Sequence, residues 1–206
     1  MKRYLYIMTA FVLFLTSCEK ETEGVSKETE FAVLTMSGPR YASIVKGGTF
    51  TDPGVTAKEG ETELDVSVSG EIDSQVPGTY DIVYTAVNQD GYPGSLTRTV
   101  AVLPSAEMAG VDISGTYAYG PAAGSSQISK LAPGFYLTTN VYSPASAMPA
   151  YIITVDGINL TLPLSSLSPY GPLKGTGTLS AAGALVYKVD VLNYGIVGST
   201  RTWKKN

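Results

Sequence analysis

The sequence contains no histidine and only one cysteine among its 206 residues. Without histidine, a protein lacks the usual general base near neutral pH, the commonest metal ligand and every Ser-His or Cys-His nucleophile system. A single cysteine excludes a disulfide within the chain, so each domain must be stabilised by its own core. We therefore expect a protein that is not an enzyme and that holds no cofactor and no metal ion.

Positive charge is also scarce, since the chain has 14 basic and 18 acidic residues and a net charge of −4. No basic cluster is longer than Lys204-Lys205, which argues against nucleic-acid binding. The charge is unevenly divided: residues 19–111 carry 15 acidic and 6 basic residues, a net −9, whereas residues 112–206 carry 3 and 6, a net +3. This asymmetry indicates two separate modules.

The N-terminus begins with the basic pair Lys2-Arg3 and continues with an apolar segment from Tyr4 to Leu15 that is followed by Thr16-Ser17-Cys18. About 12 apolar residues are too few to span a hydrocarbon core roughly 30 Å thick. The pattern resembles the lipobox of bacterial lipoproteins, which implies a signal peptide at residues 1–17 and a diacylglyceryl group on Cys18. An uncleaved anchor or a buried thiol is the alternative.

Residues 18–30 are charged and have no apolar period, which predicts a flexible tether. Short acidic runs after the lipidated cysteine resemble the surface-export signals of Bacteroidetes lipoproteins. The resemblance implies a protein that is lipid-anchored in the outer membrane and faces the cell exterior. A plain solvated spacer is the alternative, and it would leave the orientation open.

Residues 31–104 show short alternating stretches between Gly/Pro turns and no helical period, which predicts an antiparallel β-sandwich. One turn is expected at Thr51-Asp52-Pro53-Gly54, where Pro53 presets φ and Gly54 can adopt a positive φ. The motifs 48–57, 68–70, 77–84 and 97–102 resemble the bacterial immunoglobulin-like repeat of surface proteins. That family mostly provides spacers between the membrane and another domain.

Residues 105–111 form the expected linker, and residues 112–206 form a second all-β module. Its clearest signal is Asp156-Gly157 between Tyr151–Val155 and Ile158–Leu162, which predicts a type I′ hairpin. We expect an antiparallel β-meander that is either closed as a small barrel or packed as a sandwich.

Several stretches of the second module resemble a C-terminal β-domain of uncharacterised function found in Bacteroidetes lipoproteins. They are Ser114-Gly-Thr-Tyr117, Gly134-Phe-Tyr-Leu137, Gly175-Thr-Gly-Thr-Leu-Ser180 and Thr202-Trp-Lys-Lys205. The resemblance implies a link to polysaccharide capture.

Residues 112–206 contain only three acidic residues, Asp112, Asp156 and Asp190. Their spacing does not favour the pair of carboxylates, about 5 to 10 Å apart, that a glycosidase requires. Tyrosine, with 14 copies against 5 phenylalanines, is the more informative residue type. Rings with a polar tip suit carbohydrate platforms and protein interfaces. The candidate ligand-binding rings are Tyr136, Tyr142, Tyr151, Tyr170 and Trp203.

The same rings have a structural interpretation, because tyrosine is common in strands and Trp203 could fill one end of a barrel. We nevertheless expect a lipid-anchored, non-catalytic cell-surface protein whose C-terminal domain binds glycan as an accessory to polysaccharide uptake. The alternative is a structural or protein-interaction subunit, either adhesin-like or docked on an outer-membrane protein partner.

The anchoring hypothesis predicts the behaviour of the variant Cys18→Ala. Because no other segment is long and apolar enough to hold the chain in a bilayer, we expect this variant to leave the membrane fraction. Cell fractionation followed by immunoblotting measures this. Retention of the variant in the membrane fraction would show that the anchor lies elsewhere.

Overall fold

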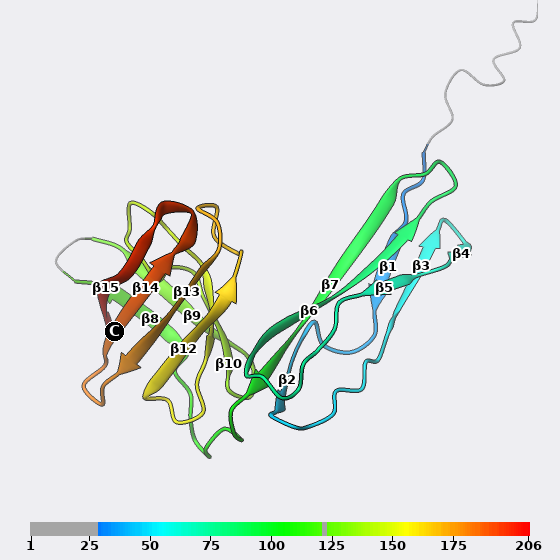
Figure 1. Cartoon of the computed structure of the whole chain (residues 1–206). Coiled ribbons are helices and arrows are strands. Elements are labelled where there is room, and N and C mark those ends of the chain that lie inside the picture. The colour runs from blue at the N-terminus through cyan, green and yellow to red at the C-terminus, as the bar shows by residue number, and fades with distance from the viewer. Residues whose placement is uncertain (1–28, 121–122) are drawn as a thin grey trace, which may run out of the picture. The chain divides into compact units, whose positions relative to one another are not determined.

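The computed structural model describes residues 29–120 and 123–206, so the expected signal peptide and Cys18 lie outside the described residues. Within these ranges every regular element is a β-strand except one 3₁₀ turn, Leu192–Tyr194 (η2) (Figure 1). The predicted all-β fold is confirmed. Among the same residues, no helix has the length and apolar character needed to cross a membrane.

Residues 31–104, called the first module below, form two sheets around a shared core (Figure 1). One sheet has the order β1-β3-β4 and the other the order β2-β7-β6-β5. The strands are β1 (Val33–Met36), β2 (Tyr41–Val45), β3 (Val55–Glu59), β4 (Thr62–Leu64), β5 (Ser67–Ser69), β6 (Gly78–Val87) and β7 (Pro93–Leu103). The core between the sheets includes Ile82, Tyr84 and Val100.

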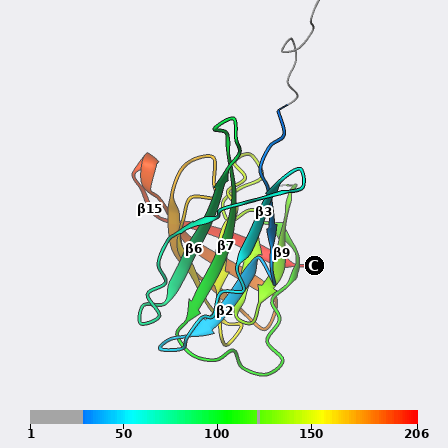
Figure 2. The same cartoon turned by 90° about the vertical axis from the view of Figure 1, so that its right-hand side faces the viewer.

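One pairing in the first module differs from the predicted antiparallel sandwich. Strand β2 runs parallel to β7, with Tyr41 opposite Thr99 and Val45 opposite Leu103, and the two strands lie side by side in Figure 2. The other pairings in these two sheets are antiparallel. Strands β3 to β6 lie between β2 and β7 in the chain. This long connection allows β7 to run in the same direction as β2, which makes the sheet mixed.

A buried guanidinium fixes the loops of the first module. Arg98 on β7 is fully buried, and its Nε lies 3.2 Å from both the Tyr84 hydroxyl and Asp52 Oδ1, while Nη2 donates to the Ser37 carbonyl at 2.7 Å. Asp52 also accepts from the Gly54 amide at 3.0 Å, and Gly54 has a φ of 85°. The expected positive φ of Gly54 is confirmed, but residues 51–54 form no backbone turn; the segment is held by the Asp52 side chain, which is tied to the core through a charged pair.

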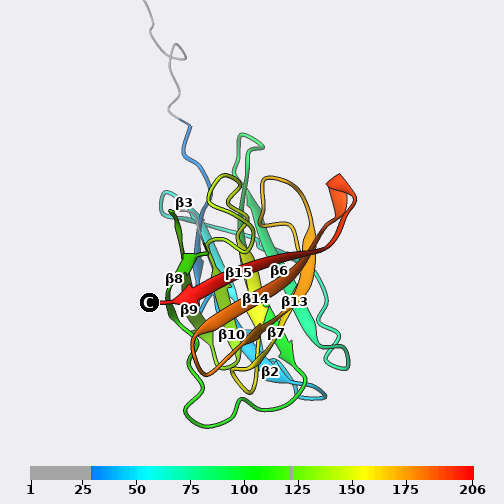
Figure 3. The ribbon, with the colours of Figure 1, turned by 90° about the vertical axis from the view of Figure 1, so that its left-hand side faces the viewer.

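Residues 112–206, called the barrel module below, form a closed barrel of eight antiparallel strands (Figure 3). Each strand pairs with the next along the chain, and β15 returns to pair with β8. The strands are β8 (Gly115–Tyr119), β9 (Ser125–Ala132), β10 (Phe135–Thr138), β11 (Ala150–Ile153), β12 (Asn159–Ser165), β13 (Leu173–Leu179), β14 (Ala184–Val191) and β15 (Ile196–Lys205). Of the two predicted arrangements, the structure has the barrel.

Large aromatic side chains fill the inside of the barrel. Tyr117, Tyr136, Tyr187 and Trp203 are at most 1% exposed and belong to one hydrophobic cluster. An eight-stranded barrel is just wide enough for its interior to be filled by side chains. Gly177 makes room for one of these rings, since a Cβ there would lie 2.8 Å from Cδ1 of Tyr187.

The hairpin between β11 and β12 forms, but its turn differs from the predicted type I′. That turn needs a positive φ at both central residues, and among the described residues only glycines have one. Gly157 has a φ of 70°, whereas Asp156 instead accepts hydrogen bonds from the amides of Ile158 and Asn159, both at 2.8 Å. The side chain of Asp156 thus replaces the backbone geometry of a two-residue turn.

The end of β7 is buried on both of its faces. Ala101 and Leu103 form a second cluster with Phe135, Tyr151 and Ile153, which lie on the outside of the barrel. The ring of Tyr41 on β2 joins this cluster at 6.1 Å from Phe135 and 6.3 Å from Tyr151. Burying an apolar side chain of this size contributes about 1.5–3 kcal/mol. This cluster therefore holds β7 against the barrel more strongly than a flexible linker alone would.

The expected linker, residues 105–111, is also held by specific contacts. Glu107 accepts hydrogen bonds from Lys130 and from the Tyr136 hydroxyl, each at 2.9 Å, and Met108 donates to the Val155 carbonyl at 2.8 Å. The pKa of Glu107 lies below its ordinary value: burial favours the protonated form, but the hydrogen bonds, that from Lys130 foremost, outweigh burial. The carboxylate therefore stabilises this end of the barrel in its charged form.

These contacts predict an acid-sensitive contribution of Glu107 to stability. Because the pKa is lower in the folded than in the unfolded chain, the contribution is complete above the unfolded pKa of about 4.3 and is lost as the pH falls through the folded value. We expect Glu107→Gln to lower the free energy of unfolding by about 1–3 kcal/mol at pH 7 and to show a shallower loss in acid. Urea unfolding at pH 7, 5 and 3.5 measures both effects.

The matched control is Glu63→Gln, which makes the same change at an exposed position on β4. It should leave the free energy of unfolding within about 0.5 kcal/mol of the parent chain. Identical pH profiles for the Glu107 variant and the parent chain would contradict the assigned role.

Candidate functional site

Three of the five predicted ligand-binding rings are buried. Tyr136 and Trp203 are 0% exposed inside the barrel, and Tyr151 is 7% exposed between the barrel and β7. Trp203 packs edge-on against Tyr119 with ring centroids 4.8 Å apart. A ring enclosed in this way offers no open face for a ligand to stack on, so the prediction that these three rings stack on a ligand is wrong.

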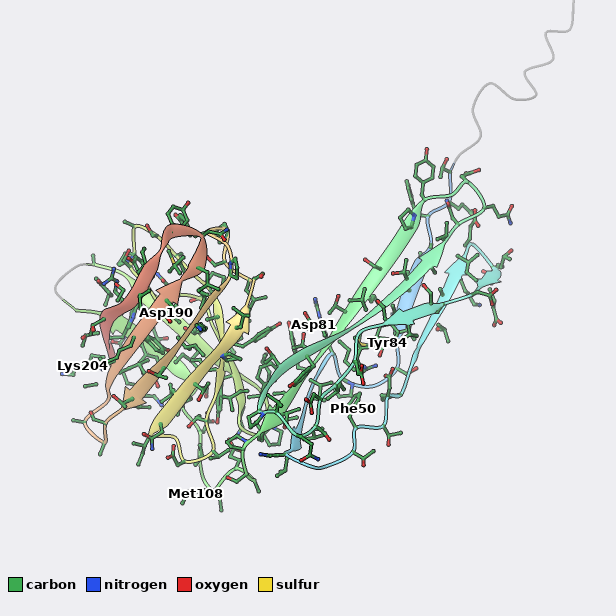
Figure 4. All side chains as sticks on the ribbon, in the orientation of Figure 1. Phe50, Asp81, Tyr84, Met108, Asp190 and Lys204 are labelled. Carbon is green, nitrogen blue, oxygen red and sulfur yellow. The ribbon has the colours of Figure 1, made fainter. Side chains whose placement is uncertain are left out.

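The two remaining predicted rings, Tyr142 and Tyr170, lie at one end of the barrel, called the loop end below. Because the strands alternate in direction, the connections 139–149, 166–172 and 192–195 all leave the barrel at this end. The opposite end carries the short turns and residues 105–111, near the position of Met108 in Figure 4. Ligands of small β-barrels bind preferentially at the mouth, which makes the loop end the candidate site.

Tyr142 covers a guanidinium at the loop end. The Cζ atom of Arg201 lies 3.8 Å from the centroid of the Tyr142 ring, which is a close cation-π contact. Arg201 Nη1 donates to the Thr200 carbonyl at 2.8 Å, whereas its buried Nε has no partner among the described residues. The pair thus places a ring and hydrogen-bond donors together at the barrel mouth.

Tyr170 forms an aromatic pair with Tyr194, which is not among the predicted ligand-binding rings. The rings of Tyr170 and Tyr194 lie 6.1 Å apart at 62°, and Tyr194 is 63% exposed. The two loops are in contact because the Asn193 side chain packs directly on the backbone of Gly171, where a Cβ would lie 2.1 Å from Nδ2 of Asn193. Tyr194 precedes a glycine and lies outside the predicted strands, which is the only sequence signal that could have indicated it.

The acidic residues of the barrel module each serve a backbone turn. Asp112 accepts from the Ser114 amide at 2.8 Å, and Asp190 accepts from the Gly198 amide at 2.7 Å. Asp156 caps its own turn, and its pKa lies at about 2, because hydrogen bonds, that from the Asn159 side chain foremost, outweigh the effect of burial. Among the described residues, no three His, Cys, Asp or Glu side chains form a group that could hold a metal ion.

Comparison with known proteins gives a match for part of the chain. Residues 34–102 match the family model of the bacterial surface protein, Ig-like domain, in agreement with the resemblance of the sequence motifs. Among solved structures, the crystal structure of a lipoprotein from Bacteroides thetaiotaomicron is similar, with 24% identity, a TM-score of 0.43, and coverage of 85% of this chain and 100% of that one. No curated protein matches the sequence.

The burial of Trp203 gives a spectroscopic prediction, because it is the only tryptophan in the chain. In the folded protein we expect a blue-shifted emission maximum and almost no quenching by iodide. After unfolding in urea we expect a red-shifted maximum and strong quenching by iodide. Fluorescence spectroscopy of residues 19–206 measures this. Strong iodide quenching of the folded protein would contradict the position inside the barrel.

Proposed function

We propose that the chain is a lipid-anchored, non-catalytic protein of the bacterial cell surface that binds glycan at the loop end of its barrel module. In this proposal Cys18 carries the anchor in the outer membrane, and residues 18–30 form the tether. The first module lifts the barrel away from the membrane, and the bound polysaccharide is held near an uptake system.

The observation that carries the glycan proposal is the pair Tyr170–Tyr194. Two rings from different loops meet edge-to-face on a rigid barrel, and the larger part of Tyr194 is accessible to solvent. Sugar rings present apolar C–H faces and a polar rim, and tyrosine matches both with its ring and its hydroxyl. The nearby pair of Tyr142 and Arg201 adds donors for sugar hydroxyls.

The proposal of a non-catalytic role is supported by what the acidic residues already do. Asp112 and Asp156 cap turns at the end of the barrel that carries residues 105–111, whereas Asp190 lies near the loop end of β14, where it is labelled in Figure 4. Acid–base hydrolysis of a glycosidic bond needs two carboxylates that flank one bond. These three carboxylates are instead held by separate backbone amides.

The match to a bacterial surface Ig-like domain supports a location at the cell surface. Such a module is a rigid spacer when its loops are fixed, and the network of Arg98, Tyr84 and Asp52 provides that rigidity here. The spacer role and the anchor together account for the order of the modules along the chain.

A protein partner is the second candidate for the loop end. Leu192 is 45% exposed and Val197 is 81% exposed, and both lie beside Tyr194 in the chain. Exposed apolar side chains next to tyrosine are typical of protein interfaces. Co-purification of an outer-membrane protein that is unaffected by added sugars would favour this function over glycan binding.

The glycan proposal predicts retarded migration of residues 19–206 in native gels that contain a bound polysaccharide. Tyr170→Ala and Tyr194→Ala should each weaken the retardation, by about two- to tenfold in apparent affinity, because each removes one stacking ring. The stability of Tyr194→Ala should change little, since the side chain is mostly exposed.

The matched control is Tyr92→Ala, which removes a 53% exposed tyrosine from the first module. This variant should migrate like the parent chain in every gel. If a folded sample is retarded by none of a broad set of plant, algal and microbial polysaccharides, glycan binding by this chain is wrong.

A further inference from the structure

A second hollow lies between β6 of the first module and the barrel, and it borders the loop end because Ser166, Leu167 and Pro172 belong to the connection 166–172. It has a volume of about 520 Å³, within the range of small-molecule sites. Its walls come from β6, β11 and the end of β12 with the loop that follows. The lining residues are Thr79, Asp81, Tyr151, Leu164, Ser165, Ser166, Leu167 and Pro172. We call it the β6–β12 groove.

One wall of the groove carries a fixed carboxylate. Asp81, labelled in Figure 4, accepts a hydrogen bond at Oδ1 from the Thr99 hydroxyl at 2.7 Å. The same hydroxyl lies 3.5 Å from the Tyr151 hydroxyl, so the row of polar groups links β6 and β7 to β11. The Asp81 side chain is exposed, and its carboxylate can therefore accept further hydrogen bonds from a ligand.

The polar row is held in place by packing. Tyr151 is 7% exposed and contacts the rings of Phe135 at 5.0 Å and Tyr41 at 6.3 Å. Asp81 and Thr99 are directly paired in the antiparallel ladder of β6 and β7. A site on strands that are locked in this way needs little reorganisation when a ligand binds, which lowers the cost of binding.

The opposite wall is apolar and open to solvent. Leu164 is 59% exposed and Leu167 is 38% exposed, and Pro172 lies beside them in the groove. Ser165 and Ser166 interrupt this wall with hydroxyl-bearing side chains. A ligand that fits must offer hydroxyl groups to one wall and apolar C–H groups to the other.

We propose that the β6–β12 groove binds a neutral oligosaccharide segment, with Asp81 accepting hydrogen bonds from its hydroxyl groups. A sugar ring has both kinds of surface that the walls require. Among the described residues that line the groove, Asp81 alone carries a charge, so uronate, sulfate and phosphate groups are repelled. The inference rests on the proposed function for its ligand class, but it names a different site.

The experiment is an NMR titration of residues 19–206 with Leu methyl and Tyr ring labels. The probes are maltotetraose, cellotetraose, laminaritetraose and mannotetraose, with tetragalacturonate as the acidic counterpart. We expect at least one neutral tetrasaccharide to shift the methyl signals of Leu164 and Leu167, and tetragalacturonate to leave them unchanged. In Asp81→Asn, which keeps an acceptor for Thr99, the affinity at these signals should fall by about tenfold or more.

The matched control is Glu63→Gln, an identical charge change on β4 that should leave the titration unaltered. If the neutral probes shift only the Tyr170 and Tyr194 rings, the groove is not a binding site and the loop-end proposal survives. If Leu164 and Leu167 shift equally in the parent chain and in Asp81→Asn, the assigned role of Asp81 is wrong. If no probe shifts either set of signals, both the groove and the loop-end proposal fail for these glycans.

Discussion

The fold depends on β7, a strand that is buried on both faces along its last residues. Arg98 and Val100 point into the core of the first module, whereas Thr99, Ala101 and Leu103 face the barrel. Side chains alternate strictly along a strand, so a slip of one residue would exchange the two sets. The guanidinium would then face an apolar contact, Asp52 would lose its charged partner, and the Ser37 and Pro39 carbonyls would lose the Arg98 donor, which is far costlier than a displaced methyl group. The buried charge of Arg98 therefore fixes the register of β7, which packs against the core of the first module on one face and against the barrel on the other.

The elements that could be predicted from the sequence are those determined by nearby residues. Alternation located β6, β7 and β14, and the positive φ of Gly54 was predicted because it depends on the glycine itself and its nearest neighbours. The parallel partner of β7 was not predicted, since Tyr41–Val45 gains its strand character from residues more than fifty positions away. For the same reason, the sequence could not distinguish a closed barrel from a sandwich. Only the return of β15 to β8 decides it, and no local pattern encodes a pairing at that separation.

The roles of the candidate rings also depend on whether distant residues cover them. Tyr136, one of the predicted ligand-binding rings, lies on β10. It fills the barrel while its neighbour Phe135 packs against β7, so both faces of this strand contact a core. A strand between two cores has no wet face, and its aromatic side chains then carry no information about ligands. Tyr142, Tyr170 and Tyr194 differ because they lie in connections, where Tyr142 and Tyr170 are only partly buried against the barrel core and Tyr194 is largely exposed.

The two ends of the barrel consequently have different tasks. At one end, Glu107 holds Lys130 and Tyr136, and Asp156 caps a short turn, so most polar groups there already have partners within the chain. A ligand at that end would have to compete with these hydrogen bonds. At the loop end, by contrast, Tyr194 is 63% exposed to solvent. Contacts with a ligand there replace water rather than internal bonds, so binding can be gained without loss of stability. This asymmetry, more than the number of tyrosines, is the reason to seek recognition at the loop end.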